Sequence, residues 1–269
     1  MWDFESNECL KTYTLTSQIN CIKKAHNNKI ICGFSDGTIQ ILDIESGECL
    51  FTINKHSSCV RAILLISNEK FASCSSDHTI KLFDLNTFES TRTFIGHEGE
   101  VLGIDKISDS YIVSCSKDYS IRIWDVNSGE CSEITRSHYD FITCVKVISH
   151  ERMISGSHME VKVWDIESRN CLHTFLLGNS FIRTILQISN NKIASGTEGG
   201  NIIIWNIDNG ETLITIETDS KVILNLAKFP NNKIISCSCD TIEVWDSENG
   251  DYLYEFEGHA ESISCLDIF

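Results

Sequence analysis

The residues best suited to chemistry lie between Cys115 and Cys131, in the segment CSKDYSIRIWDVNSGEC. Cysteine thiolates and aspartate carboxylates are metal ligands, so two cysteines close to Asp118 could belong to a metal site. Ser114 and Asp118, together with His97 upstream, also have the composition of a hydrolase triad. Whether these residues do chemistry depends on the elements that position them.

A regular spacing runs through the whole chain. A short apolar run that ends in a large residue followed by Asp or Asn recurs, and successive copies are always 40 or 41 residues apart. A fixed period of this length is typical of repeat architectures. The residues that close the copies are Asp3, Asp43, Asp84, Asp125, Asp165, Asn206 and Asp246.

Each repeat contains four short segments that alternate apolar and polar residues or are rich in β-branched residues. In the third repeat these segments, named strands a, b, c and d, are 101–108, 111–116, 120–126 and 130–135. Asp-Gly, Asn-Gly and Ser-Gly pairs favour turns between segments, and no helical periodicity competes. The sequence therefore predicts an all-β fold, in which four-stranded antiparallel sheets repeat radially as the blades of a β-propeller.

The repeats resemble the WD-repeat β-propeller family over essentially the whole chain. The resemblance rests on recurring Trp-Asp ends, on the pairs Gly96-His97 and Gly258-His259, and on Ser-x-Ser-x-Asp turns. In that family a histidine, a serine, an aspartate and a tryptophan form a hydrogen-bonded chain inside the blade. The resemblance implies this structural network for His97, Ser114, Asp118 and Trp124.

The triad composition is then better explained by structure than by catalysis. His56, Ser73 and Asp77 repeat it in the second unit, with Phe83 in place of the tryptophan. A buried polar network that ties strands together is useful in every blade, whereas a catalytic site is needed only once. We expect no catalytic residues and no cofactor, so the chain is not expected to be an enzyme.

The thirteen cysteines follow the same repeat. Most occupy equivalent positions in different blades, which lie far apart, so we expect no metal site. Cysteine at such positions is expected to act as a small buried hydrophobe. The absence of a disulfide pattern predicts a reducing compartment, the cytoplasm, with the nucleus as an alternative.

The composition limits the classes of partner. A formal net charge of -16 and a pI of about 4.9 argue against general nucleic-acid binding, which needs a basic face. No segment approaches the ~20 apolar residues that cross a bilayer, so no membrane span is expected. The expected partners are proteins or peptides, phosphorylated ones included, and the propeller is expected to be monomeric.

The repeats at the two ends are incomplete. The chain begins with the end of a strand c and a strand d (Trp2 to Leu15), continues through six complete units, and stops after one strand a (Ile263 to Phe269). Residues 1–269 are therefore expected to form one propeller domain, a fragment that lacks the middle strands of its seventh, closing blade. The alternative is a ring of six blades with both ends lying over its rim.

Propellers of this family bind partners on the face that carries the d–a and b–c loops. The second residue of strand a lies near that face and varies from repeat to repeat, as expected of a binding surface. Repeats four and five also depart from the pattern: the fourth b–c turn lacks its aspartate, and Gly178 and Gly199 replace the histidine and aspartate of the fifth. The predicted partner-binding residues are Arg61, Lys117, Tyr139, Phe141, His158, Phe181 and Arg183.

The function expected from this reading is a non-catalytic scaffold for protein–protein interaction. One alternative is a phosphopeptide receptor of a ubiquitin ligase, because the repeat ends look similar to F-box/WD-repeat substrate receptors, in which arginines hold phosphate. Another is a structural subunit of a larger assembly. Neutral drift of the fourth and fifth repeats is the simpler explanation of their irregularity.

Overall fold

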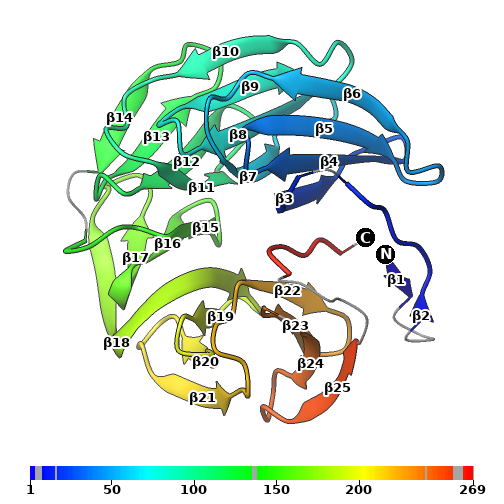
Figure 1. Ribbon diagram of the computed structural model, residues 1–269. Coiled ribbons are helices and arrows are strands. Elements are labelled where there is room, and N and C mark those ends of the chain that lie inside the picture. The colour runs from blue at the N-terminus through cyan, green and yellow to red at the C-terminus, as the bar shows by residue number, and fades with distance from the viewer. Residues whose placement is uncertain (4–7, 16, 135–137, 240, 257–262, 269) are drawn as a thin grey trace.

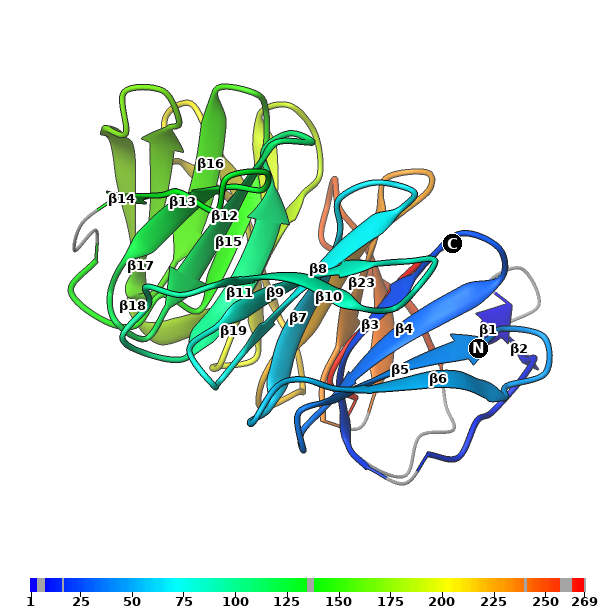
Figure 2. The same cartoon turned by 90° about the horizontal axis from the view of Figure 1, so that it is seen from above.

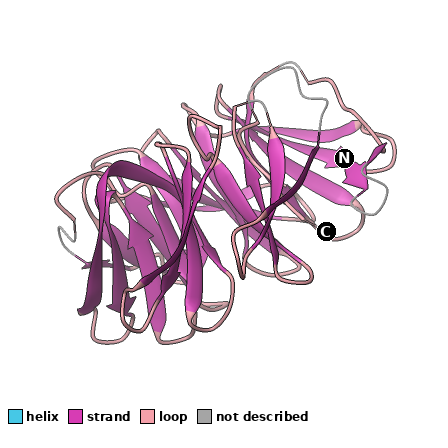
Figure 3. Cartoon of the chain, turned by 90° about the horizontal axis from the view of Figure 1, so that it is seen from below, coloured by secondary structure: helices cyan, strands magenta, loops and turns pink. Residues whose placement is uncertain are grey.

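The structure is a computed structural model that describes residues 1–3, 8–15, 17–134, 138–239, 241–256 and 263–268. Throughout these residues the regular elements are β-strands, as Figure 3 shows. In the same part of the chain no helix is long and apolar enough to cross a membrane. The all-β prediction is confirmed.

Four of the sheets are antiparallel and four-stranded, and we call them blades 1, 2, 3 and 6. Blade 1 comprises β3 (Ile19–Lys24), β4 (Lys29–Phe34), β5 (Thr38–Asp43) and β6 (Cys49–Asn54). Blade 2 comprises β7 (Val60–Leu65), β8 (Lys70–Ser75), β9 (Ile80–Asp84) and β10 (Ser90–Phe94). Blade 3 comprises β11 (Val101–Lys106), β12 (Tyr111–Ser116), β13 (Ile121–Asp125) and β14 (Cys131–Ile134). Blade 6 comprises β22 (Asn225–Phe229), β23 (Lys233–Cys237), β24 (Ile242–Asp246) and β25 (Tyr252–Phe256).

The fourth and fifth repeats form one seven-stranded sheet. Its strands are β15 (Cys144–Val147), β16 (Arg152–Gly156), β17 (His158–Asp165), β18 (Cys171–Gln187), β19 (Lys192–Thr197), β20 (Asn201–Asn206) and β21 (Thr212–Glu217). The long strand β18 is both strand d of blade 4 and strand a of blade 5. Because β17 starts at His158, its first residues pair with Leu176 and Phe181 and extend the ladder where a loop was expected.

The blades are arranged around a common centre, with strand a of each blade innermost (Figure 1). Neighbouring blades pack face to face through apolar side chains, and the view in Figure 2 shows the sheets side by side. At the first seam, Ile31 and Ile41 of blade 1 lie in one buried cluster with Val60 and Phe71 of blade 2. Full burial of each such side chain stabilises the fold by about 1.5–3 kcal/mol, so these seams hold neighbouring blades together.

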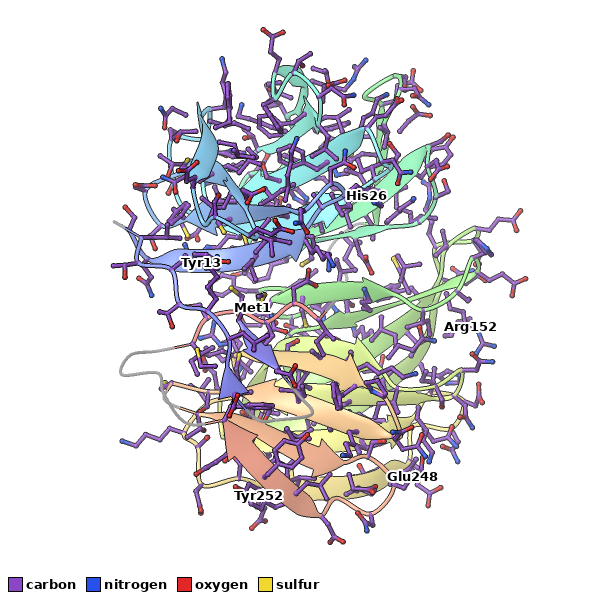
Figure 4. All side chains as sticks on the ribbon, turned by 90° about the vertical axis from the view of Figure 1, so that its right-hand side faces the viewer. Met1, Tyr13, His26, Arg152, Glu248 and Tyr252 are labelled. Carbon is purple, nitrogen blue, oxygen red and sulfur yellow. The ribbon has the colours of Figure 1, made fainter. Side chains whose placement is uncertain are left out.

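Both ends of the chain lie between blade 6 and blade 1 (Figure 1). Strands β1 (Trp2–Asp3) and β2 (Glu8–Cys9) form a two-stranded sheet, and both are short compared with the end of strand c and the strand d predicted from Trp2 to Leu15. Figure 4 shows Met1 and Tyr13 on this segment, and the Tyr13 hydroxyl donates a hydrogen bond to the Ile44 carbonyl of blade 1.

The strand a predicted from Ile263 to Phe269 is not a strand over residues 263–268, and Phe269 lies outside the described residues. Among the described strands none pairs with this segment in the way that strand b pairs with strand a elsewhere. Its side chains still pack: Ile263 is buried against blade 6, with Leu266 and Ile268 at the edge of the same cluster.

All thirteen cysteines are free thiols. Those of strand b are buried, and burial raises the pKa of the Cys32 thiol to about 12, which keeps it neutral. The expectation of buried cysteines is wrong for strand d, where the thiols are exposed because this strand is the outer edge of each blade. The exposed strand-d thiols are Cys9, Cys49, Cys131 and Cys171.

Candidate partner-binding site

A chain of hydrogen bonds crosses the interior of blade 3. His97 Nδ1 lies 2.7 Å from Asp118 Oδ2, and His97 Nε2 lies 2.7 Å from Ser114 Oγ. The Trp124 indole donates to the same serine oxygen at 2.8 Å. Although burial alone would raise the pKa of the Asp118 carboxyl, hydrogen bonds from His97 and Ser120 bring it well below its usual value. The four residues thus form a buried hydrogen-bonded network that joins the strands of the blade. We call this network the buried tie.

The same tie occurs in the two neighbouring blades. In blade 2, His56 contacts Asp77 and Ser73 at 2.7 Å each. In blade 4, His138 contacts Ser155 at 2.6 Å and Glu160 at 2.7 Å. Glu160 therefore takes the place of the aspartate whose loss the sequence suggested. A set of residues repeated in successive blades and closed to solvent has the character of a buried polar network that joins strands.

Sequence reasoning missed His138, although a signal for it exists. The histidine stands four residues before a buried apolar residue at or just before the start of strand a, as in the pairs His97/Val101 and His138/Ile142. At this position blade 5 has Gly178 and blade 6 has Asp219. Blades 5 and 6 keep only the tryptophan–serine bond of the tie, at 2.9 Å in each.

On the face of the d–a and b–c loops, three predicted cationic residues lie beside glutamates. Lys117 Nζ is 2.6 Å from Glu100 Oε1, and Arg61 Nη2 is 2.9 Å from Glu100 Oε2. Burial alone would raise the pKa of Glu100, but Lys117, Ser76 and Arg61 together lower it to about 2. The Arg183 guanidinium is paired with Glu198 in the same way. Each of these cations is therefore already paired within the chain, and Arg61 and Lys117 share the single charge of Glu100.

Aromatic rings on the same loop face form two groups. The Phe141 ring stacks on Tyr119 with 5.5 Å between centroids, and the Lys117 ammonium lies 5.9 Å from the centre of Phe141. Both rings remain more than a third exposed. This group joins blade 3 to the d–a loop that leads into blade 4.

The second group joins blades 4 and 5. His158 stacks on Phe181 with centroids 4.3 Å apart, and its Nδ1 lies 3.2 Å from Asp140 Oδ2. Tyr139 is 96% exposed, with the Lys162 ammonium 5.7 Å from the centre of its ring. We name the five rings of the two groups the aromatic cluster; they are Tyr119, Tyr139, Phe141, His158 and Phe181.

The structure thus brings the predicted residues together in part. Lys117 and Phe141 are in contact, and so are His158 and Phe181. Arg183 lies apart from Arg61, each in its own ion pair. Tyr119 was missed because it follows the turn aspartate as an ordinary turn residue, and only the fold places it against Phe141. Among the described residues no group of three His, Cys, Asp or Glu side chains is arranged to hold a metal ion.

Comparison with known proteins agrees with the repeat geometry. The model of the WD domain, G-beta repeat, matches residues 7–43, 47–84, 88–125 and 129–165. Each match ends on an aspartate that closes one of the repeats. Protein groucho of Drosophila melanogaster is 34% identical over 77 residues, which cover 27% of this chain and 10% of that protein. Because the four matches together cover more than half of the sequence, the chain belongs to the WD-repeat family.

Proposed function

We propose that this protein is a non-catalytic interaction scaffold that binds a protein or peptide on its d–a and b–c loop face, through the aromatic cluster. The observation that carries the proposal is the 96% exposure of Tyr139, two residues before Phe141, which is itself 37% exposed and stacks on the exposed Tyr119. Aromatic side chains left in water are the residue types that anchor protein interfaces. Membership of a family of interaction scaffolds supports the same conclusion.

The charges around the aromatic cluster favour an apolar or aromatic ligand over a phosphate. A phosphopeptide bound at Arg61 would have to displace the Glu100 carboxylate, which also accepts a hydrogen bond from Ser76 at 2.8 Å. Arg183 would have to give up Glu198. The phosphopeptide-receptor alternative therefore carries an electrostatic cost that recognition by the aromatic cluster does not. A structural subunit of a larger assembly would use the same rings as a permanent contact.

We propose further that the domain is a propeller of six complete blades and an incomplete seventh, to which both ends of the chain contribute. In blade 3, Asp105 on strand a accepts from the Val147 amide at 2.8 Å and pairs with Lys146 at 3.1 Å. Asp267 makes the matching contacts with the first strand of blade 1, at 2.7 Å to the Lys24 amide and 2.5 Å to Lys23.

A second correspondence supports this arrangement. The Ile263 amide donates to the Ser238 carbonyl at 3.3 Å, as the Ile142 amide donates to the Ser116 carbonyl at 3.3 Å. Residues 263–268 therefore occupy the place of an innermost strand, although they do not form one. The strands between them and the β1–β2 pair are the part that a complete seventh blade would add.

Site-specific photo-crosslinking tests the binding proposal. A benzoylphenylalanine is placed at Tyr139 on the loop face or, as the matched control, at Tyr111, which is 45% exposed at the start of strand b on the opposite face. The proposal predicts that Tyr139 crosslinks to one reproducible protein in cell lysate and that Tyr111 does not. Equal crosslinking from both positions, or none from Tyr139, would contradict it.

A further inference from the structure

Blade 6 has a different chemistry from its neighbours at the position of the buried tie. Ser236 and Trp245 are present and bonded at 2.9 Å, but Asp219 stands where blades 2, 3 and 4 have histidine. On strand c, opposite the serine, blades 3 and 4 have Arg122 and Lys162, whereas blade 6 has Glu243. Acidic groups therefore replace basic ones at both positions.

Glu243 is in an unfavourable setting for a carboxylate. It is only 7% exposed, and its cross-strand partner on β25, directly opposite, is Glu255. Like charges directly opposite each other destabilise a sheet. The single hydrogen bond of the Glu243 carboxylate within the described residues comes from the Ser236 hydroxyl at 3.5 Å, beyond the usual 2.5–3.0 Å range of such bonds.

The burial of Glu243 raises the pKa of its carboxyl, and Glu255 and Asp219 raise it further. Folding gains nothing from this arrangement, since a glutamine at position 243 would fill the same volume without the charge. Departures of this kind from the pattern of a fold are expected at functional or strained sites.

A cavity of about 350 Å³ opens beside Glu243, at the seam of blades 5 and 6. Two aromatic rings, Trp245 and Tyr252, form part of its wall and meet edge to face at 5.5 Å. Figure 4 shows Tyr252 on the outer strand of blade 6. The cavity is lined by Glu217, Asp219, Glu243, Trp245, Tyr252 and Glu255.

Glu243, the buried carboxylate of the lining, has no cationic partner among the described residues. Within the described part of the chain, Glu217, Asp219 and Glu243 take part in no ion pair. In blade 4 the buried carboxylate of Glu160 does have basic partners, with His138 at 2.7 Å and Lys162 at 3.5 Å. Those basic groups come from the chain itself, and blade 6 has no counterpart of either.

We propose that this cavity binds the lysine or arginine side chain of a protein partner, with the carboxylates of Glu243 and Asp219 as counter-charges and the rings of Trp245 and Tyr252 as its walls. A cation over an aromatic face is attracted by the ring, and a buried carboxylate adds a charge-assisted hydrogen bond. The cavity is separate from the aromatic cluster, so this inference stands independently of the proposed function.

Nuclear magnetic resonance on the intact protein tests the proposal. The five tryptophans give five indole N–H signals, and the Trp245→Phe variant identifies the one that faces the cavity. The probes are capped Gly-Lys-Gly and Gly-Arg-Gly peptides, with capped Gly-Gln-Gly as the neutral control. We expect both basic peptides to shift the Trp245 signal in a saturable manner and the glutamine peptide to leave it unchanged.

Glu243→Gln should weaken binding of the basic peptides by about tenfold or more, the scale of losing one buried charge partner. Glu211→Gln, at an exposed loop of blade 5, is the matched control and should bind as the parent protein does. Glu243→Gln relieves the repulsion with Glu255, so loss of folding is not expected to obscure the result. Equal shifts with the glutamine peptide, unchanged affinity in Glu243→Gln, or a response to calcium but not to the basic peptides would each overturn the proposal.

Discussion

His138 Nδ1 lies 2.7 Å from Glu160 Oε1, the same separation that joins His97 to Asp118 one blade earlier. The two carboxylates reach their histidines by different routes. Asp118 extends from the b–c turn, whereas Glu160 extends from within β17, and its longer side chain covers the difference. The buried tie is therefore preserved although the residue that completes it has changed.

Removal of the Glu160 carboxylate should destabilise the protein. Glu160→Ala leaves a buried ring nitrogen of His138 without its acceptor, and this should lower the free energy of unfolding by about 1–3 kcal/mol. Urea denaturation measures the change, with Glu151→Ala in an exposed turn of the same blade as control. Glu160→Asp should not restore stability, because its shorter side chain cannot reach His138. Full stability in Glu160→Ala would show that the tie is dispensable.

Acid should weaken the fold through the carboxylates whose pKa is lowered. The pKa of Asp118 lies below its ordinary value of 3.8, and that of Glu100 falls from 4.5 to about 2. A carboxyl with a lowered folded-state pKa contributes stability above its ordinary pKa and loses it as the pH falls towards the folded value. Unfolding free energy should therefore decline from about pH 4.5 downward. In Asp118→Asn the decline should be shallower, and the variant should be less stable at neutral pH; an unchanged slope would contradict this.

Glu243 should show the opposite dependence on pH. Its pKa is raised in the folded state, so its ionised form opposes folding, and the penalty grows as the pH rises above its ordinary value of 4.5. Glu243→Gln should therefore melt at a higher temperature than the parent at pH 7, and the two should converge near pH 4. Thermal melts at the two pH values check this. A less stable variant at pH 7 would mean that the Glu243 carboxylate is paired.

Asp267 should anchor the end of the chain to blade 1. Asp267→Asn weakens the ion pair with Lys23 and the hydrogen bond accepted from the Lys24 amide. The Lys24 amide should therefore exchange its hydrogen faster, whereas the amides of blade 3 should keep their protection. Hydrogen-exchange mass spectrometry resolves the two regions, and Asp251→Asn in an exposed loop is the control. Unaltered protection in β3 would remove the main support for a seventh blade.

Much of the fold follows from local pattern. The strands of blade 3 begin and end within two residues of their predicted bounds wherever these residues are described, because alternation and turn residues are properties of neighbouring positions. The continuity of β18 could not be predicted in this way. It depends on His158 pairing with Phe181, a contact that the short b–c turn makes possible only once the sheet has formed.

The site was less predictable than the fold because its contacts join different repeats. Arg61 and Glu100 are 39 positions apart, and nothing in either segment indicates that the arginine is paired. His138 was overlooked for a related reason. The residue before it is not glycine and its acidic partner is a glutamate, so the sequence lacks the Gly-His and aspartate motif, although the folded blade contains the hydrogen-bonded pair. Types of residue were predictable, and their pairing across blades was not.

The most direct test of the account is the affinity of the protein crosslinked at Tyr139 for three forms of this chain. These are the parent, the double variant Tyr139→Ser/Phe141→Ser, and the control Tyr111→Ser on the opposite face. Loss of aromatic anchors typically costs 2 kcal/mol or more, so calorimetry should show about a thirtyfold or greater weakening in the double variant. The control should bind as the parent does. Parent-like affinity in the double variant, with its melting temperature unchanged, would contradict the assignment of the aromatic cluster as the binding site.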